Sequence, residues 1–181
     1  MVNVLLFRAQ PFHDGHMANI EKAMHDAIIN DTQVHIFIGS ADKVGTARNP
    51  LPIDLRHDLV SNAINERFGA DAKRIIIHEL NDLDDEANNS YDWGDYLYFT
   101  MADRAGDGQI VMYYSDKPEI MLSWFRPALR DRIYFKFLER VDDISATEVR
   151  YAIKKNDDNY LSSVLPDYVY NKLPEIRKYI K

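Results

Sequence analysis

The chain has no cysteine among its 181 residues. Disulfides, thiolate zinc sites and a cysteine nucleophile are therefore excluded, and the composition is compatible with a reducing cytosol. Residues 1–12 lack a basic start followed by a long apolar run, and nowhere do about 18 apolar residues occur together. Because secretion and membrane spanning lack support, we expect a cytoplasmic protein without a membrane partner.

Positive charge is also in short supply, with 22 Lys and Arg against 29 Asp and Glu and a formal net charge of −7. Generic binding to a nucleic-acid backbone relies on many cations, so we expect no nucleic-acid partner. The 46% hydrophobic and 28% charged residues are typical of a compact soluble globule. We find no internal repeat or linker, and the length predicts one domain over 1–181.

Short apolar runs alternate with stretches of helical periodicity along most of the chain. The runs predict strands at 2–7, 34–38, 74–80, 109–114 and 132–138. The periodic stretches predict helices at 16–28, 52–68, 93–101, 146–155 and 168–180. Strands that alternate with helices favour an α/β fold with a doubly wound, Rossmann-like parallel sheet, with C-terminal helices added. We expect a catalytic core over about 1–155 and a helical segment over about 156–181.

The loop after the first strand carries a histidine pair at the start of a helix. His13 and His16 are three residues apart, which lets both imidazoles point at one object, and Gly15 between them has no side chain to block a ligand. Unpaired N–H groups and the positive dipole end favour an anion there. The loop therefore indicates a phosphate site. Two surface histidines at a turn remain an alternative, whereas a zinc site would need a third ligand that this loop does not supply.

Other phosphate signatures are missing or point elsewhere. Neither a Walker loop nor a Gly-x-Gly-x-x-Gly fingerprint after a strand is present. The dipeptide His-Asp occurs three times, beginning at His13, His25 and His57, but an all-helical His-Asp phosphohydrolase does not fit a strand-rich pattern. We place His25 and His57 on solvated helix faces.

A second candidate anion site lies far along the chain. Ser145 and Glu148 form a capping box, which by itself indicates only a well-made helix start. A capping box does not require Thr147 or Arg150, however. A helix N-terminus rich in Ser and Thr, with an arginine one turn further on, could hold a triphosphate from the side opposite the histidines.

Together the two motifs resemble the HxGH nucleotidyltransferase superfamily, and within it the nicotinamide mononucleotide adenylyltransferases, especially the archaeal-type branch and the adenylyltransferase half of bifunctional Nudix proteins. The residues that carry the resemblance are Arg8, Gln10, Pro11, Phe12, His13, Gly15 and His16, with Ile144, Ser145, Thr147 and Arg150. It covers roughly residues 1–155. Phe7 and Ala9 depart from the family's pattern, in which glycine and phenylalanine flank the arginine.

The resemblance implies an enzyme of NAD biosynthesis that transfers AMP from ATP to nicotinamide mononucleotide and releases pyrophosphate, with Mg²⁺ arriving with ATP. It implies catalytic roles for His13, His16 and Arg150. It implies ATP contacts for Arg8, Gln10, Phe12, His13, Gly15, His16, Ser145, Thr147 and Arg150, with no protein-ligated metal.

Two further sites follow from the resemblance. Arg48, in Thr46 to Pro50, resembles the arginine of the family's Arg-x-Asn-Pro loop, which meets nucleotide phosphate; an exposed arginine before a turn is the alternative. Asp82 and Trp93 resemble the pair around the nicotinamide pocket, and Trp93 could equally be a core aromatic.

An acidic stretch beside Trp93 bears on the choice of acceptor. It comprises Asp82, Asp84, Asp85, Glu86 and Asp92. Such a run is often only a solvated loop. If it rims the acceptor pocket, it repels the extra carboxylate of nicotinate mononucleotide, and we expect nicotinamide mononucleotide to be preferred.

Two rival functions stay open from the sequence. The motifs bind ATP or CTP and say little about the acceptor, so a flavin or pantetheine phosphate is an alternative. A catalytically inactive nucleotide sensor is another, because fold does not fix function. The pattern does not decide whether the chain forms a homo-oligomer.

Overall fold

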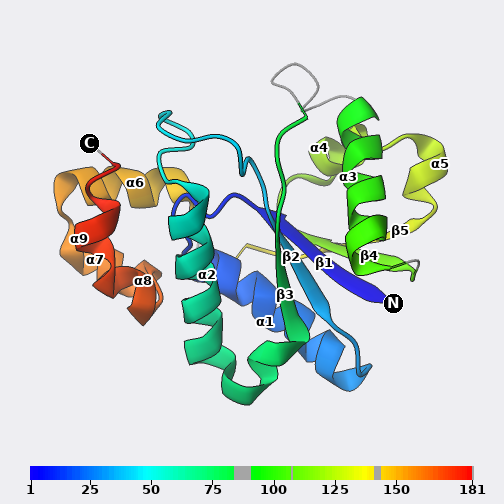
Figure 1. Cartoon of the computed structure of the whole chain (residues 1–181), viewed down its shortest axis with the longest axis horizontal. Coiled ribbons are helices and arrows are strands. Elements are labelled where there is room, and N and C mark those ends of the chain that lie inside the picture. Colours follow the sequence, from blue (N-terminus) through cyan, green and yellow to red (C-terminus); the bar gives the residue numbers. More distant parts are fainter. Residues whose placement is uncertain (84–90, 107, 141–143, 181) are drawn as a thin grey trace.

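The computed structural model describes residues 1–83, 91–106, 108–140 and 144–180 (Figure 1). The strands are β1 (Val2–Phe7), β2 (Val34–Ile38), β3 (Ile75–Glu79), β4 (Ile110–Tyr114) and β5 (Ile133–Phe137). The long helices are α1 (Asp14–Ile29), α2 (Ile53–Phe68), α3 (Tyr91–Ala105) and α6 (Ala146–Lys155). The shorter ones are η1 (Gly69–Arg74), α4 (Pro118–Trp124), α5 (Pro127–Arg130), α7 (Asp158–Val164), α8 (Asp167–Asn171) and α9 (Leu173–Ile176).

The five strands form one parallel sheet in the order β3-β2-β1-β4-β5. This confirms the doubly wound α/β fold, and the strand bounds agree with the predictions to within one residue. The chain builds outward from β1 in both directions, so the strand order reverses between β1 and β4. In open parallel sheets ligands bind beyond the carboxyl ends of the strands at such a reversal.

Alternate residues of the central strand face two different cores. Leu5 packs with α1 and α2, whereas Val4 packs with α3 and α4. Because both faces are covered, the inner strands are apolar on both sides, which is why they read as continuous apolar runs. In Figure 1, α3, α4 and α5 lie on one side of the sheet and α6 to α9 gather beside α2.

The C-terminal part differs from the prediction. A single helix over 168–180 is wrong, since α8 ends at Asn171 and α9 covers only Leu173–Ile176. Pro174 lies in the first turn of α9, where its missing N–H is tolerated, and in a longer helix it would interrupt the hydrogen bonds. The pattern also missed α7, and it missed α4 and α5, both of which begin with a proline.

These C-terminal helices are fastened to α2 by polar contacts. The Tyr168 hydroxyl donates to the Asp58 carboxylate at 3.1 Å, and the Tyr168 N–H donates to Glu66 at 3.2 Å. Lys172 forms an ion pair with Asp58 at 3.7 Å. The segment therefore packs as a part of the same core as the sheet.

Helices α3 and α4 meet at backbone distance. A Cβ built on Gly94 would lie 1.9 Å from the Trp124 carbonyl oxygen, so only glycine fits this crossing. Arg126 fixes the start of α3 through Asp95 at 2.8 Å and Asp92 at 3.1 Å. These contacts set the position of Trp93, which neighbours Gly94.

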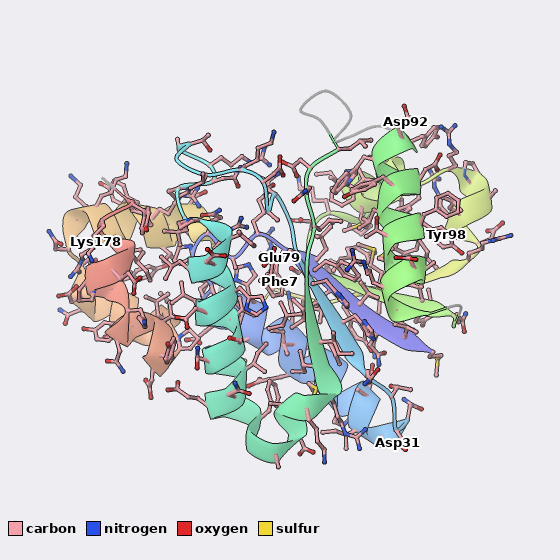
Figure 2. The ribbon with its side chains drawn as sticks, in the orientation of Figure 1. Phe7, Asp31, Glu79, Asp92, Tyr98 and Lys178 are labelled. Atoms are coloured by element: carbon pink, nitrogen blue, oxygen red, sulfur yellow. The ribbon has the colours of Figure 1, made fainter. Side chains whose placement is uncertain are left out.

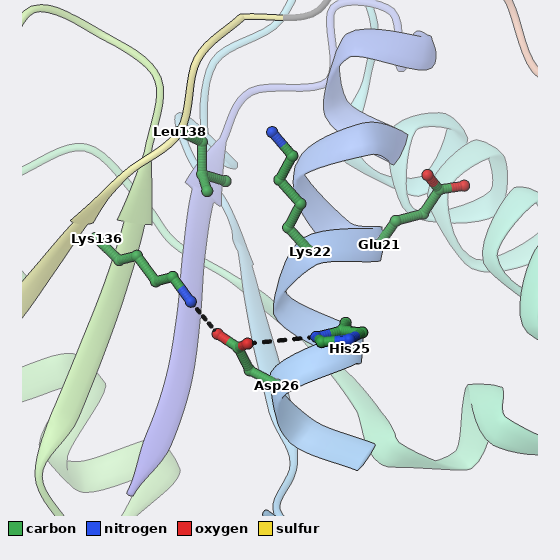
Figure 3. Close-up of a pocket in the computed structure, with 6 residues that line it drawn as sticks. All are labelled: Glu21, Lys22, His25, Asp26, Lys136 and Leu138. Carbon is green, nitrogen blue, oxygen red and sulfur yellow. Dashed lines mark hydrogen bonds and ion pairs between the residues drawn. The ribbon is translucent and has the colours of Figure 1, made fainter. Parts of the chain in front are cut away.

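A cavity of about 380 Å³ lies between α1 and β5. Figure 3 shows Lys136 and His25 both directed at Asp26 beside it. Its lining consists of Glu21, Lys22, His25, Asp26, Lys136 and Leu138, and includes none of the predicted site residues. Of the helices described, none combines the length and the apolar character needed to cross a membrane.

Candidate active site

The histidine pair lies at the start of α1. His13 is the N-cap, and α1 starts at Asp14, two residues earlier than predicted. The rings of His13 and His16 are 3.8 Å apart between centroids, and the Phe12 ring stacks on His16 at 5.5 Å. The two imidazoles therefore lie side by side at the carboxyl end of β1.

The hydrogen bonding of His16 determines which of its nitrogens faces a ligand as a donor. The His13 backbone N–H donates to His16 Nδ1 at 3.3 Å. Because Nδ1 accepts, we assign the proton of the neutral imidazole to Nε2. His16 can then donate from Nε2 to a phosphate oxygen.

Burial keeps both histidines neutral. It lowers the pKa of His13 to about 4, helped by the nearby charge of Arg140, and it lowers the pKa of His16 well below its ordinary value, helped by His13. The Nδ1 atom of His13 is buried and has no hydrogen-bond partner among the described residues. A buried polar atom without a partner is uncommon, and a bound ligand would explain it.

Gly15 leaves little room for any side chain. A Cβ there would lie 3.1 Å from two atoms of the His13 ring and 3.6 Å from the Ile144 carbonyl oxygen. The two predicted motifs therefore approach each other closely at Gly15, although they are far apart in sequence. A larger residue at this position would push against the His13 ring.

Gln10 and Phe12 are buried beneath the loop. The Gln10 side chain donates to the Leu51 carbonyl at 3.3 Å and accepts from the Leu51 N–H at 2.9 Å. Phe12 has no exposed surface. The side chains of Gln10 and Phe12 thus hold the loop in place. Their predicted contact with ATP stays a proposal.

The start of α6 has the predicted capping box. Ser145 Oγ accepts from the Glu148 N–H at 3.2 Å, and Glu148 accepts from the Ser145 N–H at 3.2 Å. Arg150 extends to the first motif, where its Nη1 donates to the Gln10 carbonyl at 2.9 Å. Its Nη2 donates to Thr147 at 3.2 Å. Arg150 therefore joins the two predicted anion sites into one.

Three arginines gather at this junction. Burial lowers the pKa of the Arg8 guanidinium, and the neighbouring charges of Arg48 and Arg150 lower it further, while Asp82 acts in the opposite direction. Burial and Arg48 likewise lower the pKa of Arg150. Like charges held this close repel each other, so the cluster favours a bound polyanion.

The two residues predicted to bind the acceptor, Asp82 and Trp93, lie beyond β3. Asp82 Oδ1 accepts from Ser40 Oγ at 3.0 Å. Trp93 is only 5% exposed and packs against Tyr96 and Trp124, so the structure places it as a core aromatic. This is the alternative that the sequence left open for Trp93, and a contact of Trp93 with an acceptor stays a prediction. Figure 2 shows Asp92 at the start of α3, and its pairing with Arg126 offsets its charge.

The predicted acidic rim lies partly outside the described residues. Asp84, Asp85 and Glu86 lie outside the described residues. A cavity of about 480 Å³ lies along the edge of β3, and it is lined by His57, Ile77, His78, Glu79, Asn81, Tyr96 and Arg104. His57 is thus half-buried against a cavity, whereas His25 is exposed as expected.

Two residues near the site were missed from the sequence. Arg140 follows β5, donates to the Ser115 carbonyl at 3.2 Å and pairs with Asp116 at 2.6 Å. Its charge acts on His13. Arg56 is fully buried in α2. An arginine within the apolar face of a helix was the available signal for Arg56, whereas Arg140 carried none.

Metal ligands are scarce at the site. Within the described parts of the chain, no three His, Cys, Asp or Glu residues are grouped as a metal centre would need. The donors here are arginines, histidines and N–H groups, which suit phosphate oxygens.

We predict that the free energy of unfolding decreases as the pH is lowered from about 6.5 to about 4. Burial lowers the pKa values of His13, His16, His35 and His78, and the last pair share a 2.9 Å hydrogen bond. The unfolded chain takes up protons below about 6.5, whereas folded His13 and His78 resist until about 4, so acid favours unfolding. Urea midpoints measured across this range test the prediction.

Two matched variants compare a half-buried histidine with an exposed one. His78→Gln should flatten the pH dependence, and His25→Gln, at a side chain that is 73% exposed, should leave it unchanged. A wild-type midpoint that stays constant from pH 7 to pH 5 would contradict the prediction.

Part of the chain is similar in sequence to a known adenylyltransferase. Over 59 residues the chain is 39% identical to a nicotinamide-nucleotide adenylyltransferase from Picrophilus torridus. That match covers 33% of this chain and 32% of the relative, so it spans about a third of each. No family model matches the chain.

Solved structures share the fold. A bifunctional NMN adenylyltransferase/ADP ribose pyrophosphatase from Francisella tularensis has a TM-score of 0.73 at 21% identity, over 98% of this chain and 49% of that one. Its complex with AMP and a Mn ion has a TM-score of 0.62, also at 21% identity, over 85% of this chain and 41% of that chain. Plasmodium falciparum nicotinic acid mononucleotide adenylyltransferase complexed with NaAD has a TM-score of 0.58 at 15% identity, over 98% of this chain and 96% of that chain. The chain therefore has the fold of these adenylyltransferases.

Proposed function

We propose that the protein is an adenylyltransferase that joins AMP from ATP to nicotinamide mononucleotide, forming NAD and pyrophosphate. One observation carries the proposal: Arg150 bonds the Gln10 carbonyl at 2.9 Å, which brings the loop of His13 and His16 against the start of α6. Two helix N-termini and three arginines then surround a single place for a triphosphate. The domain that does this spans 1–181, with its catalytic core over 1–155.

The reaction requires no protein nucleophile. A 5′-phosphate oxygen of the mononucleotide forms a bond to the α-phosphorus of ATP, and the bond from that phosphorus to the bridging oxygen of the β-phosphate breaks. Pyrophosphate leaves with the electron pair. Such transfers depend on positioning and on neutralising charge, which these side chains supply.

Each group has a role that follows from its chemistry. His16 donates from Nε2 to the transferred phosphate, and His13 offers its unpartnered imidazole beside it. Arg150, Ser145 and Thr147 hold the β- and γ-phosphates as charge moves to the leaving pyrophosphate. Arg8 and Arg48 neutralise the remaining phosphate charge.

A divalent ion enters with the substrate in this proposal. The Francisella relative was solved with AMP and Mn. We propose Mg²⁺ bound to the phosphates of ATP, where it offsets their negative charge. The residues of this chain then act on the phosphate oxygens that the ion leaves free.

We predict that kcat/KM with nicotinamide mononucleotide exceeds that with nicotinate mononucleotide. Asp82 lies at the acceptor side, and its negative charge repels the extra carboxylate of nicotinate mononucleotide. Steady-state rates with both mononucleotides at fixed ATP test this. Asp82→Asn should narrow the preference, whereas Asp71→Asn, in η1, should leave it unchanged.

The same assay separates the proposed function from its rivals. A panel that adds flavin mononucleotide and phosphopantetheine, with pyrophosphate release as the readout, identifies the acceptor. Equal use of both mononucleotides would remove Asp82 from the acceptor site. Nucleotide binding without pyrophosphate release from any acceptor would favour a sensor.

A further inference from the structure

Arg56 lies beneath the candidate site with no exposed surface. Its Nη1 donates to the carbonyl oxygens of Arg8 at 3.0 Å and Gly39 at 2.8 Å, and its Nη2 donates to that of Ser40 at 2.9 Å. Burying a cation is costly, and a guanidinium is suited to it because its fixed fork of donors can satisfy several acceptors at once. The Arg56 side chain therefore joins three backbone carbonyls in addition to packing in the core.

The three carbonyls belong to the first residues beyond two neighbouring strands. Arg8 follows β1, and Gly39 and Ser40 follow β2. Both loops contain a non-glycine residue in the left-handed region, Ala9 at φ 52° and Ser40 at φ 51°. Residues rarely adopt this conformation unless their surroundings hold them in it. The bonds from Arg56 are part of what holds these loops.

The connection continues to a third strand. Ser40 Oγ donates to Asp82 Oδ1 at 3.0 Å, and Asp82 follows β3. In addition, the Ala41 N–H donates to the Leu80 carbonyl at 3.0 Å. A continuous path thus runs from Arg8 through Arg56 and Ser40 to Asp82.

We propose that Arg56 is a positioning residue that sets the distance between Arg8, on the ATP side, and Asp82, on the acceptor side. The proposal rests on the adenylyl transfer proposed above, in which two substrates must be aligned in line. Arg56 itself touches neither substrate. A misplacement of about 1 Å can lower a rate by about 100-fold, so loosening this path should affect kcat most.

Two variants of Arg56 and one control test the proposal. Arg56→Met removes the donors, and Arg56→Lys retains the charge but cannot bridge three carbonyls. The control is Ile64→Ala. Ile64 lies on the same helix two turns further on, is 3% exposed and makes no hydrogen bond from its side chain to either loop. All are assayed at a temperature at which circular dichroism shows each to be folded.

We expect kcat to fall by roughly 100-fold in Arg56→Met and by less in Arg56→Lys, with a smaller change in KM for ATP. Ile64→Ala should lose stability and retain its kcat. If the Arg56 variants keep a kcat within about twofold of wild type, or if Ile64→Ala loses as much, Arg56 is only a structural residue.

Hydrogen exchange provides a readout that does not depend on catalysis. The Gly39 N–H donates to the Phe7 carbonyl at 2.9 Å, and the Ala41 N–H donates to the Leu80 carbonyl. We expect both amide protons to exchange at least about tenfold faster in Arg56→Met than in Ile64→Ala. A wild-type chain that forms no dinucleotide would refute the proposed function alone. Unchanged exchange at Gly39 and Ala41 would refute the role of Arg56 whatever the activity.

Discussion

Replacing His16 by alanine should lower kcat by roughly 100- to 1,000-fold while the protein stays folded. The imidazole is held by the His13 N–H and by the ring of Phe12, which fixes Nε2 as a donor. Loss of one preorganised donor to a developing charge has an effect of this size. Single-turnover rates with saturating ATP measure the chemical step directly.

The chain offers a matched control on the same helix. His25 is also in α1, and its side chain is 73% exposed and away from the loop motifs. His25→Ala should keep the wild-type kcat. A folded His16→Ala protein with wild-type kcat would contradict the role of His16 in the transferred-phosphate contact.

Replacing Arg150 by alanine should lower kcat/KM for ATP by at least roughly 100-fold. Its guanidinium is charged, half-buried and close to Arg48, so it adds a concentrated positive charge where we propose that pyrophosphate leaves. Arg150→Lys retains the charge without the fork and should recover part of the rate. Initial rates of pyrophosphate release over a range of ATP concentrations test both variants.

Arg150 also has a structural role, because its Nη1 donates a hydrogen bond to the Gln10 carbonyl at 2.9 Å. Some loss of stability is therefore expected in the alanine variant. Thermal unfolding with and without ATP separates the two effects, since a lost phosphate contact also removes stabilisation by the nucleotide. An Arg150→Ala protein that unfolds at a lower temperature but retains full specific activity would show that Arg150 only holds the loop in place.

The sheet could be predicted because its strands are buried on both faces. Val4 and Leu5 point to opposite cores and are both apolar, so the run is continuous and its ends are sharp. The C-terminal helices were predicted less well: Pro174 was a local signal against one helix over 168–180, whereas the contact of Tyr168 with Asp58 depends on tertiary structure. Short helices such as α5 have too few turns to show a period.

The candidate site was predictable where it consists of the start of a helix. Both helix starts are local features, and the sequence predicted the Ser145 cap at its residue and the start of α1 to within two residues. The positions of Arg56 and Trp93 were not predictable in the same way. Arg56 bonds carbonyls 16 to 48 residues away, and Trp93 is buried by a crossing of α3 over α4 that Gly94 permits.

The most direct test of adenylyl transfer follows the phosphorus atoms of ATP. The purified chain is incubated with Mg²⁺, nicotinamide mononucleotide and ATP labelled either at the α- or at the γ-phosphorus, and the products are separated. We predict that the α-label appears in a dinucleotide and the γ-label in an equal amount of pyrophosphate. An α-label that remains in ATP, ADP or AMP, with no labelled dinucleotide, would contradict the proposed function.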